Sequence, residues 1–264
     1  MQFTLTSDEG LPIRGNLVIP GDAEALAVIV HGFKGFKDWA FFPWLAGYLT
    51  EQRIAVCRFN MSRSGIGEDL ETFDRLDLFA DDTYSGELAD LRTVVRHAQE
   101  HVDLPTFLFG HSRGAGVALL GAADVPKLHG VVAWNGIAYA DRWDPATRNR
   151  WRRSGHFDFE NARTRQMMRM STRVLDDLDA NRFDILKAVS RLNVPLLAIH
   201  GGRDETVPAR ESVELAETAR EAVRVMIRTA THTLNAAHPL VKVPRTLELA
   251  AAVTSRFISA YAAP

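Results

Sequence analysis

The segment between residues 106 and 123 constrains the fold of this chain more than any other part of the sequence. A β-like run, Thr106–Phe109, leads into the pentapeptide Gly-His-Ser-Arg-Gly at residues 110–114, and a helical run of small residues follows up to Ala123. A serine in this setting lies on a sharp strand-to-helix turn with strained backbone angles, and the flanking glycines leave room for the neighbouring strand and helix. The turn pushes the hydroxyl out of the sheet. The pattern therefore predicts a layered α/β fold with Ser112 as a candidate nucleophile.

Length and composition fit a large α/β domain. The chain has 264 residues, of which 46% are hydrophobic, so it can bury a sizeable core. Its formal net charge is −2 and no run of lysine and arginine interrupts it, which argues against a nucleic-acid partner. No apolar stretch is long enough to span a bilayer, and the N-terminal residues 1–6 lack the pattern of a signal peptide. We therefore expect no membrane partner.

The single cysteine, Cys57, lies in the apolar run 54–57 and is expected to be buried. One cysteine excludes an intramolecular disulfide and a cysteine metal cluster, and it fits a reducing compartment. We expect a cytoplasmic protein that needs no metal and no other cofactor. The sequence leaves the oligomeric state open, a homo-oligomer included.

Apolar runs alternate with helical patterns along the rest of the chain. Residues 3–6 and 13–19 are expected to form an opening antiparallel pair. Strands buried on both faces are expected at residues 26–30, 54–59, 106–109, 129–134, 195–200 and 223–227. Helices are expected near residues 39–52, 81–100 and 240–261. This order predicts a mostly parallel, doubly wound sheet of about eight strands with helices on both faces.

One stretch, residues 136–190, breaks the alternation. It lies between two expected strands, is helical in character and is far longer than the roughly dozen residues that a crossover needs. We interpret it as a small helical cap inserted into a single domain that spans residues 1–264. A helical pattern places Met167, Met170, Val174 and Leu178 near one face. That stripe either packs on the domain or lines a substrate pocket, where Met167, Met168 or Met170 are the candidate residues.

A serine hydroxyl needs a histidine base, and the histidine needs an acid that fixes its tautomer and stabilises its cation. On a fold of this kind the chain order is serine, then Asp or Glu after a later strand, then histidine after the last strand. Asp204 lies in the turn that follows the run 196–199, and His232 follows the run 223–227. We therefore predict Ser112, Asp204 and His232 as a catalytic triad.

Other residues compete for these roles. His238 could replace His232 as the base, and Glu205 could replace Asp204 as the acid. His156 lies in the expected cap, where it could touch a substrate. His200 ends a strand and is expected to bond to the backbone.

The loop after residue 30 reads His-Gly-Phe-Lys-Gly, and its glycines allow a tight turn beside Ser112. An oxyanion hole needs two backbone N–H donors. We assign one donor to Arg113, directly after the nucleophile, and the other to Phe33 in this loop. Candidate substrate-binding residues nearby are His31, Lys34 and His111, although His31 is also placed to brace the loop.

Four motifs together resemble the α/β-hydrolase superfamily over nearly the whole chain: the His-Gly loop at 31–35, the Gly-His-Ser-Arg-Gly turn, the Gly-x-x-Asp-x-x-Val-Pro segment at 201–208, and the late histidine. A glycine-containing loop at residues 58–67 also matches. Within the superfamily, the motifs are most similar to the dienelactone-hydrolase-like and the feruloyl (cinnamoyl) esterase-like groups. Dienelactone hydrolases use a cysteine nucleophile, so Ser112 argues against that activity. The resemblance implies an α/β-hydrolase fold with a serine nucleophile.

The expected cap is rich in arginine, which can bind carboxylates or phosphates through paired donors. Its cationic residues are Arg142, Arg148, Arg150, Arg152, Arg153, Arg163, Arg165, Arg169 and Arg173. They either contact an anionic substrate, face solvent, or pair with the acidic stretch 68–82. We expect most of them to face solvent, which favours a neutral ester.

The sequence as a whole predicts a serine hydrolase that cleaves a small-molecule carboxylic ester or thioester through an acyl-enzyme intermediate. A peptidase or a cofactor-free peroxidase could use the same triad. A non-catalytic small-molecule-binding protein on the same fold is a further alternative. The residues do not identify the substrate or its acyl length.

Overall fold

The computed structural model describes residues 1–262, and the last two residues of the predicted domain lie outside this range. Eight strands form one sheet in the order β1-β2-β4-β3-β5-β6-β9-β10. The strands are β1 (Gln2–Thr6), β2 (Pro12–Val18), β3 (Ala25–Val30), β4 (Ile54–Phe59), β5 (Thr106–His111), β6 (Leu128–Trp134), β9 (Leu196–Gly201) and β10 (Ala222–Ile227). The pairings of β2 with β1 and β4 are antiparallel and the others are parallel. The predicted eight-stranded sheet is confirmed.

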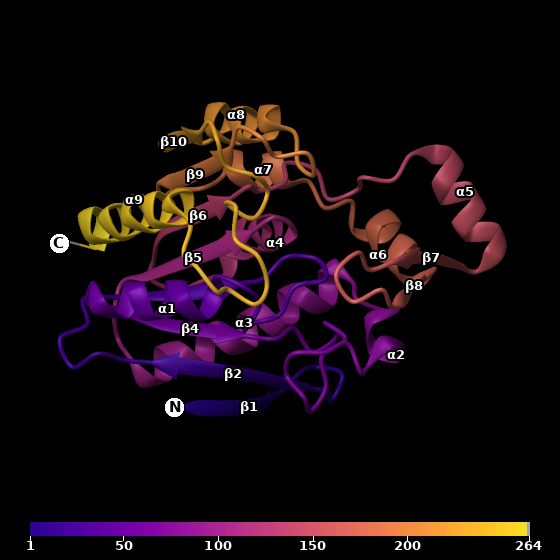
Figure 1. The fold of residues 1–264 in the computed structure, drawn as a ribbon, viewed down its shortest axis with the longest axis horizontal. Coiled ribbons are helices and arrows are strands. Elements are labelled where there is room, and N and C mark those ends of the chain that lie inside the picture. The colour runs from indigo at the N-terminus through magenta and orange to yellow at the C-terminus, as the bar shows by residue number, and fades with distance from the viewer. Residues whose placement is uncertain (263–264) are drawn as a thin grey trace.

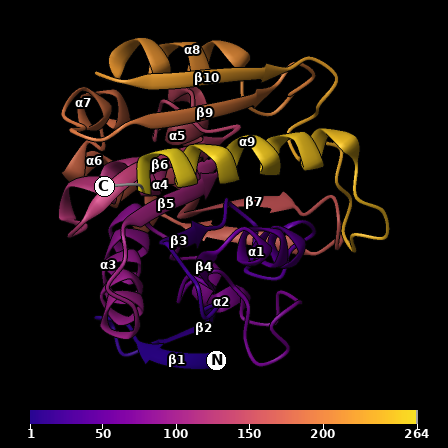
Figure 2. The same ribbon diagram turned by 90° about the vertical axis from the view of Figure 1, so that its left-hand side faces the viewer.

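Helices cover both faces of this sheet (Figures 1 and 2). On one face lie α1 (Phe42–Glu51) and α9 (Arg245–Ala262), which pack against β3 and β4 and their neighbours. On the other lie α3 (Tyr84–His101), α4 (Arg113–Gly121), α7 (Ile185–Ser190) and α8 (Ala209–Thr218). The short α2 (Leu76–Phe79) contacts β8 (Met167–Ser171), and a 3-10 turn, Ala122–Asp124, follows α4. None of the helices described is long and apolar enough to cross a membrane.

The central strand β3 shows why the sheet has two cores. All six of its residues are buried, as expected for a parallel strand with helices on both faces. Successive side chains point to opposite faces, so Leu26, Val28 and Val30 join one core while the alternate residues join the other. The sheet therefore holds the carboxyl ends of its parallel strands at one edge, where loops can carry a site.

Residues 136–190 form a lobe at the right of Figure 1. They include α5 (Pro145–Ser154), the antiparallel pair β7 (His156–Glu160) and β8 (Met167–Ser171), and α6 (Arg173–Asn181), before α7 returns to the main body. The helical interpretation of residues 167–171 was wrong. Those residues form a strand, in which Met168 and Met170 are buried and Met167 is 61% exposed. Alternation along a strand separates side chains that a helix would have placed together.

Two helix boundaries differ from the sequence prediction, and one helix was not predicted. The helix expected at 81–100 begins at Tyr84, because the Thr83 side chain caps it by accepting a hydrogen bond from the Gly86 N–H. The last helix begins at Arg245, so residues 240–244 lie in the preceding loop. Helix α8, which separates β9 from β10, was not anticipated.

Candidate active site

Ser112 lies between β5 and α4 with φ 57° and ψ −124°, a backbone conformation that L-residues rarely adopt. Its neighbours must be small. A Cβ at position 110 would lie 2.3 Å from the Ala115 Cα, and one at position 114 would lie 2.4 Å from the Val30 carbonyl oxygen. Glycine is therefore required at both places, as the sequence pattern indicated. The turn presents Ser112 at the carboxyl end of β5.

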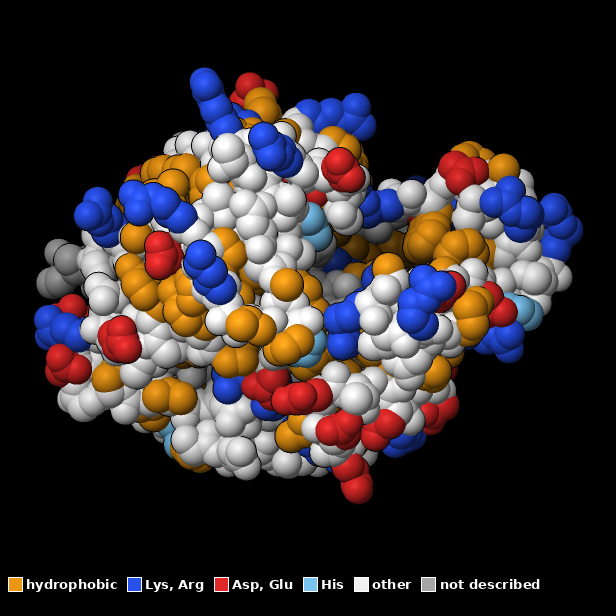
Figure 3. Space-filling view, viewed as in Figure 1, with side chains coloured by type: hydrophobic (Ala, Val, Ile, Leu, Met, Phe, Trp, Pro, Cys, Tyr) orange, Lys and Arg blue, Asp and Glu red, His pale blue; other side chains and the backbone are white. Residues whose placement is uncertain are grey.

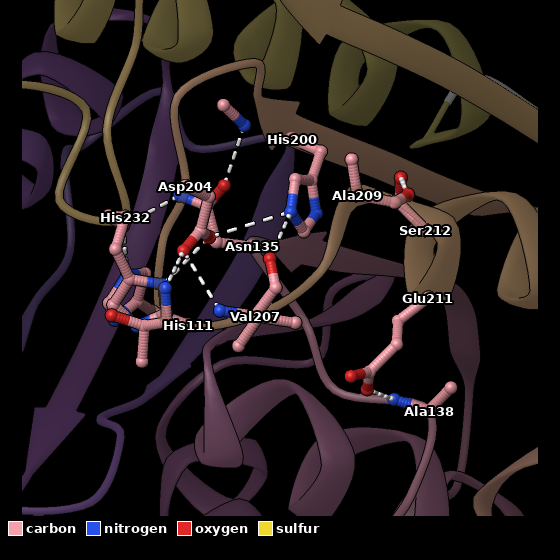
Figure 4. A network of polar contacts seen from close by, with 12 residues as sticks. His111, Asn135, Ala138, His200, Asp204, Val207, Ala209, Glu211, Ser212 and His232 are labelled. Atoms are coloured by element: carbon pink, nitrogen blue, oxygen red, sulfur yellow. Dashed lines mark hydrogen bonds and ion pairs between the residues drawn. The ribbon is translucent and has the colours of Figure 1, made fainter.

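Asp204 and His232 meet although 28 residues separate them. Asp204 follows β9, His232 follows β10, and the His232 Nδ1 lies 2.8 Å from the Asp204 Oδ2 (Figure 4). The Asp204 Oδ1 accepts hydrogen bonds from the backbone N–H groups of Thr206, at 2.8 Å, and Val207, at 2.9 Å. The Asp204 carboxylate is fully buried, whereas the His232 side chain is 16% exposed. The acid is thus fixed from three directions, and one end of the imidazole remains accessible.

The surroundings of Asp204 keep it ionised. Burial by itself would raise its pKa, but the hydrogen bond from His232 and those from the Thr206 and Val207 N–H groups lower the pKa below its ordinary value. An ionised Asp204 accepts the Nδ1 proton of His232, which leaves Nε2 as the free base nitrogen.

His232 is also held through its backbone. Its carbonyl oxygen accepts hydrogen bonds from His111 Nε2, at 2.8 Å, and from Asn135 Nδ2, at 2.7 Å. Asn135 follows β6 with φ 45°, and its Oδ1 accepts the Gly201 N–H at 2.7 Å. Asn135 was not among the sequence candidates. An Asn-Gly pair directly after an apolar run is the signal that could have found it.

Two histidines near Ser112 are buried and have little tendency to ionise. Burial lowers the pKa of His111 to about 3, and burial lowers the pKa of His31 to about 4. His31 Nδ1 lies 3.0 Å from the Gly32 carbonyl oxygen, and its Nε2 accepts the Met61 N–H at 3.1 Å. His31 therefore braces the loop that carries Phe33, and it does not line the cavity described next.

Ser112, His232, Phe33 and Arg113 line one cavity of about 580 Å³, which falls in the usual range for small-molecule sites. Of the other sequence candidates, Lys34, His111 and Met170 line it, whereas Met167 lies on the surface. Its walls are mainly apolar and aromatic and come from the body and from the 136–190 lobe: Trp39, Phe42, Tyr84, Ile137, Trp143, Val174, Leu178 and Val207. Figure 3 shows apolar side chains inside the hollow between body and lobe.

The two loops that carry Phe33 and Arg113 are joined by side-chain contacts. The Arg113 guanidinium is buried, donates to Glu87 Oε2 at 2.8 Å and lies 4.2 Å from the Tyr84 ring centroid. It also lies 5.6 Å from the Phe33 ring. The Phe33 ring in turn packs at 5.7 Å from Phe159 of the lobe, measured between centroids. The residue after Ser112 therefore contacts the loop that carries the other expected oxyanion donor.

The rival candidates lie elsewhere. His238 Nδ1 accepts the Ala40 N–H at 2.8 Å, and its ring stacks on Trp39. His238 itself does not line the cavity. Glu205 is exposed. His156 lies 3.4 Å from Asp158 on β7. His200 donates from Nε2 to the Val207 carbonyl at 3.0 Å, which agrees with the backbone bond expected for it.

Most arginines of the lobe form ion pairs, and their partners lie mainly in the lobe itself. Arg148 pairs with Asp141 at 2.6 Å, Arg152 with Asp179 at 2.7 Å, and Arg169 with Asp158 at 2.7 Å. The acidic stretch 68–82 contributes one partner, Asp81, which lies 3.1 Å from Arg173. Ion pairs within the lobe thus outnumber those with the acidic stretch. Arg142 and Arg163 line the cavity.

A search of residues 1–262 finds no group of three or more His, Cys, Asp or Glu side chains arranged to hold a metal ion. The polar groups gathered around Ser112 are instead a buried acid, an accessible imidazole and backbone N–H groups. This set of groups can move a proton and stabilise a negative charge.

Both the sequence and the structure of this chain are similar to those of known proteins. The sequence matches the profile of the alpha/beta hydrolase family over residues 27–246, and a search of curated proteins found no match. The structure of Est1E from Butyrivibrio proteoclasticus with ferulic acid bound is 22% identical over 98% of both chains, with a TM-score of 0.74. The esterase domain of a Rhodothermus marinus protein is 20% identical over 100% of this chain and 99% of that one, with a TM-score of 0.71. Dienelactone hydrolase from Anabaena variabilis is 19% identical over 99% and 98%, with a TM-score of 0.65.

These structural likenesses establish the fold, and they include members of the groups to which the motifs pointed. The family match covers most of the chain and contains Ser112, Asp204 and His232. The chain belongs to the alpha/beta hydrolase family.

Proposed function

We propose that this protein is a serine hydrolase that cleaves a carboxylic ester through an acyl-enzyme intermediate. The observation that carries the proposal is the meeting of three features at one cavity. These are the strained backbone of Ser112, the His232–Asp204 hydrogen bond at 2.8 Å, and an apolar space of about 580 Å³ in front of them. The names of the similar structures, an esterase domain among them, point the same way.

In the proposed mechanism, His232 Nε2 takes the hydroxyl proton as the Ser112 Oγ attacks the acyl carbonyl carbon. Backbone N–H groups of Phe33 and Arg113 stabilise the oxyanion of the tetrahedral intermediate. The ester bond then breaks, and His232 gives the proton to the departing alcohol. Water attacks the acyl-enzyme with His232 again as the base, which releases the acid and restores Ser112. Asp204 stays ionised and stabilises the imidazolium.

Residues 136–190 act in this proposal as a cap. Trp143, Met170, Val174 and Leu178 from this segment line the cavity opposite Ser112, so they exclude water from the reacting groups. The cap sets which acyl and alcohol groups fit, while the main body supplies the chemistry.

The decisive test combines a covalent probe with turnover. Wild-type protein should react with a fluorophosphonate and hydrolyse p-nitrophenyl esters, and Ser112→Ala should lose labelling and lower kcat by several orders of magnitude. Ser190→Ala is the matched control, because Ser190 is exposed at the end of α7 and outside the cavity lining. Labelling that survives in Ser112→Ala would show that another residue is the nucleophile. A wild-type protein that neither labels nor turns over would favour a binding role.

A further inference from the structure

Four cationic side chains line the cavity, and two of them are neutralised by a carboxylate. Arg113 pairs with Glu87 at 2.8 Å, and Arg142 lies 2.8 Å from both oxygens of Glu211. Both of these acids are buried. No Asp or Glu is found among the cavity-lining residues of the described chain. These two arginines therefore form structural ion pairs, and their charge is balanced before any substrate enters.

Lys34 and Arg163 differ from that pair. Over residues 1–262, neither has a carboxylate oxygen within 4.0 Å. Each lies instead against aromatic rings. The Lys34 Nζ is 5.5 Å from the Phe159 ring centroid, and the Arg163 guanidinium is 5.5 Å from the Phe36 ring centroid. An aromatic face stabilises a cation far less than a desolvated ion pair can.

The directions of the pKa shifts also distinguish Arg113 from Lys34 and Arg163. For Arg113, burial lowers the pKa, but Glu87 and Asp82 outweigh burial and hold the pKa above its ordinary value. For Lys34 and for Arg163, burial lowers the pKa and no acid opposes it. A partly desolvated cation without a counter-charge is stabilised by any anion that reaches it. The cavity lining thus holds two cations, Lys34 and Arg163, that a negatively charged substrate group would stabilise.

We propose that Lys34 and Arg163 bind a second, unreacting carboxylate of the substrate, so that this protein acts on anionic esters. The inference rests on the proposed esterase function and names its substrate class. The Lys34 Nζ lies 5.8 Å from the Phe33 ring centroid, so the charged group would lie near Phe33, and the apolar wall takes the carbon chain between the two ends. The half-buried Lys34 provides most of the discrimination, and the exposed Arg163 guides the anion into the mouth.

The test uses two substrates that differ in one charge: the p-nitrophenyl monoester of suberic acid and that of suberamic acid, which has a neutral carboxamide in place of the free carboxylate. At low salt the wild type should hydrolyse the anionic ester with a kcat/KM at least tenfold higher. Lys34→Met should lower this ratio several-fold, Arg163→Gln should lower it less, and the double variant should bring it close to one. High salt should reduce the wild-type ratio. Methionine keeps a long unbranched chain at a position whose φ is 60°.

Arg169→Gln is the matched control. It also removes one positive charge from the cap, but Arg169 pairs with Asp158 and does not line the cavity, so its ratio should equal that of the wild type. Lys34→Arg should retain part of the preference. A wild-type ratio of one or below would overturn the inference. An equal fall in Arg169→Gln and Lys34→Met would also overturn it, because net charge alone would then explain the preference.

Binding to Ser112→Ala separates this inference from the proposed function. Equilibrium binding of the two esters to this variant needs no turnover. Tighter binding of the anionic ester that is lost with Lys34→Met supports the carboxylate site even if wild-type protein proves not to be an esterase. Esterase turnover with equal binding of both esters would retain the proposed function and reject the anionic substrate.

Discussion

At the residue scale, His232, the proposed base, is positioned by its main chain as much as by its ring. The His232 carbonyl accepts from both His111 and Asn135, while its ring meets Asp204. Sequence order led to the prediction of Ser112, Asp204 and His232 as a triad, because each follows a recognisable strand. It could not predict Asn135, because that side chain acts on a residue 97 positions away and its role depends on a long-range contact.

Asn135→Ala should lower kcat by roughly 10–100-fold with a much smaller change in KM, because displacement of His232 harms proton transfer more than substrate binding. His111→Phe should have a smaller effect, since Asn135 then remains as a donor. The kcat from steady-state kinetics and the rate of fluorophosphonate labelling should fall together. Unchanged kcat in Asn135→Ala, with only a lower Tm, would mean that Asn135 has a structural role alone.

At the element scale, α4 is tied to α3 by a buried ion pair. Arg113 opens α4, Glu87 lies in the first turn of α3, and their side chains are 10% and 2% exposed. Burial raises the pKa of Glu87, and the charge of Arg113 opposes that rise. The sequence patterns of the two helices did not reveal this ion pair. The motif around Ser112 assigns a role only to the backbone N–H of Arg113 and says nothing about its side chain.

Glu87→Ala should lower the free energy of unfolding by about 3–5 kcal/mol, because the buried Arg113 charge loses its nearest partner. Disruption of the exposed pair Arg92–Asp124 by Arg92→Ala should cost less than about 1 kcal/mol. Urea unfolding of the two variants beside the wild type provides the comparison. Similar losses in both would show that Asp82 replaces Glu87 as the partner of Arg113.

The cap is held by aromatic packing at its outer end. Trp151 of α5 is 1% exposed and packs against Trp143 and Phe157, with ring centroids 5.4 Å from each. The sequence indicated an insertion here but assigned helix to part of a hairpin. A short segment with several methionines does not show whether its apolar residues recur every two residues, as in a strand, or about every four, as in a helix.

Trp151→Ala should loosen the cap without unfolding the main body, because the cavity it leaves is local to the lobe. We expect faster proteolysis within residues 136–190, a higher KM and a small change in global Tm. Arg150→Ala, on the same helix and exposed, is the control. Global unfolding of Trp151→Ala at a much lower temperature would mean that cap and body form one cooperative unit.

At the scale of the whole molecule, the sheet order follows from physical rules that a sequence can reveal, since buried apolar strands alternating with helices have few ways to pack. The balance of buried charge cannot be predicted from the sequence in this way, because it depends on which acids the fold brings together. Asp90 is buried beside Glu87, and burial raises its pKa to about 6 although Ser62 hydrogen bonds oppose the shift.

This shift predicts a pH dependence of stability. Folded Asp90 keeps its proton up to about pH 6, whereas in the unfolded chain it loses the proton near its ordinary pKa of 3.8. The folded state therefore binds more protons between these values, and stability from this residue falls as the pH rises through that window, by an amount on the order of 3 kcal/mol. Urea unfolding from pH 4 to 7 should show a shallower decline for Asp90→Asn than for the wild type. The exposed Asp103→Asn is the control, and parallel curves for Asp90→Asn and the wild type would contradict the prediction.

The contact between Phe33 and Phe159 has a consequence for how a protein of this shape can evolve. One ring belongs to the loop proposed to hold the oxyanion, and the other belongs to a cap strand that helps define the pocket. Selectivity and rate are then not separate traits. A change in the cap that admits a new substrate also moves a wall behind the loop, so transplanting a cap from a relative should require matching changes at the loop. Laboratory evolution toward new esters should accumulate paired substitutions across this contact.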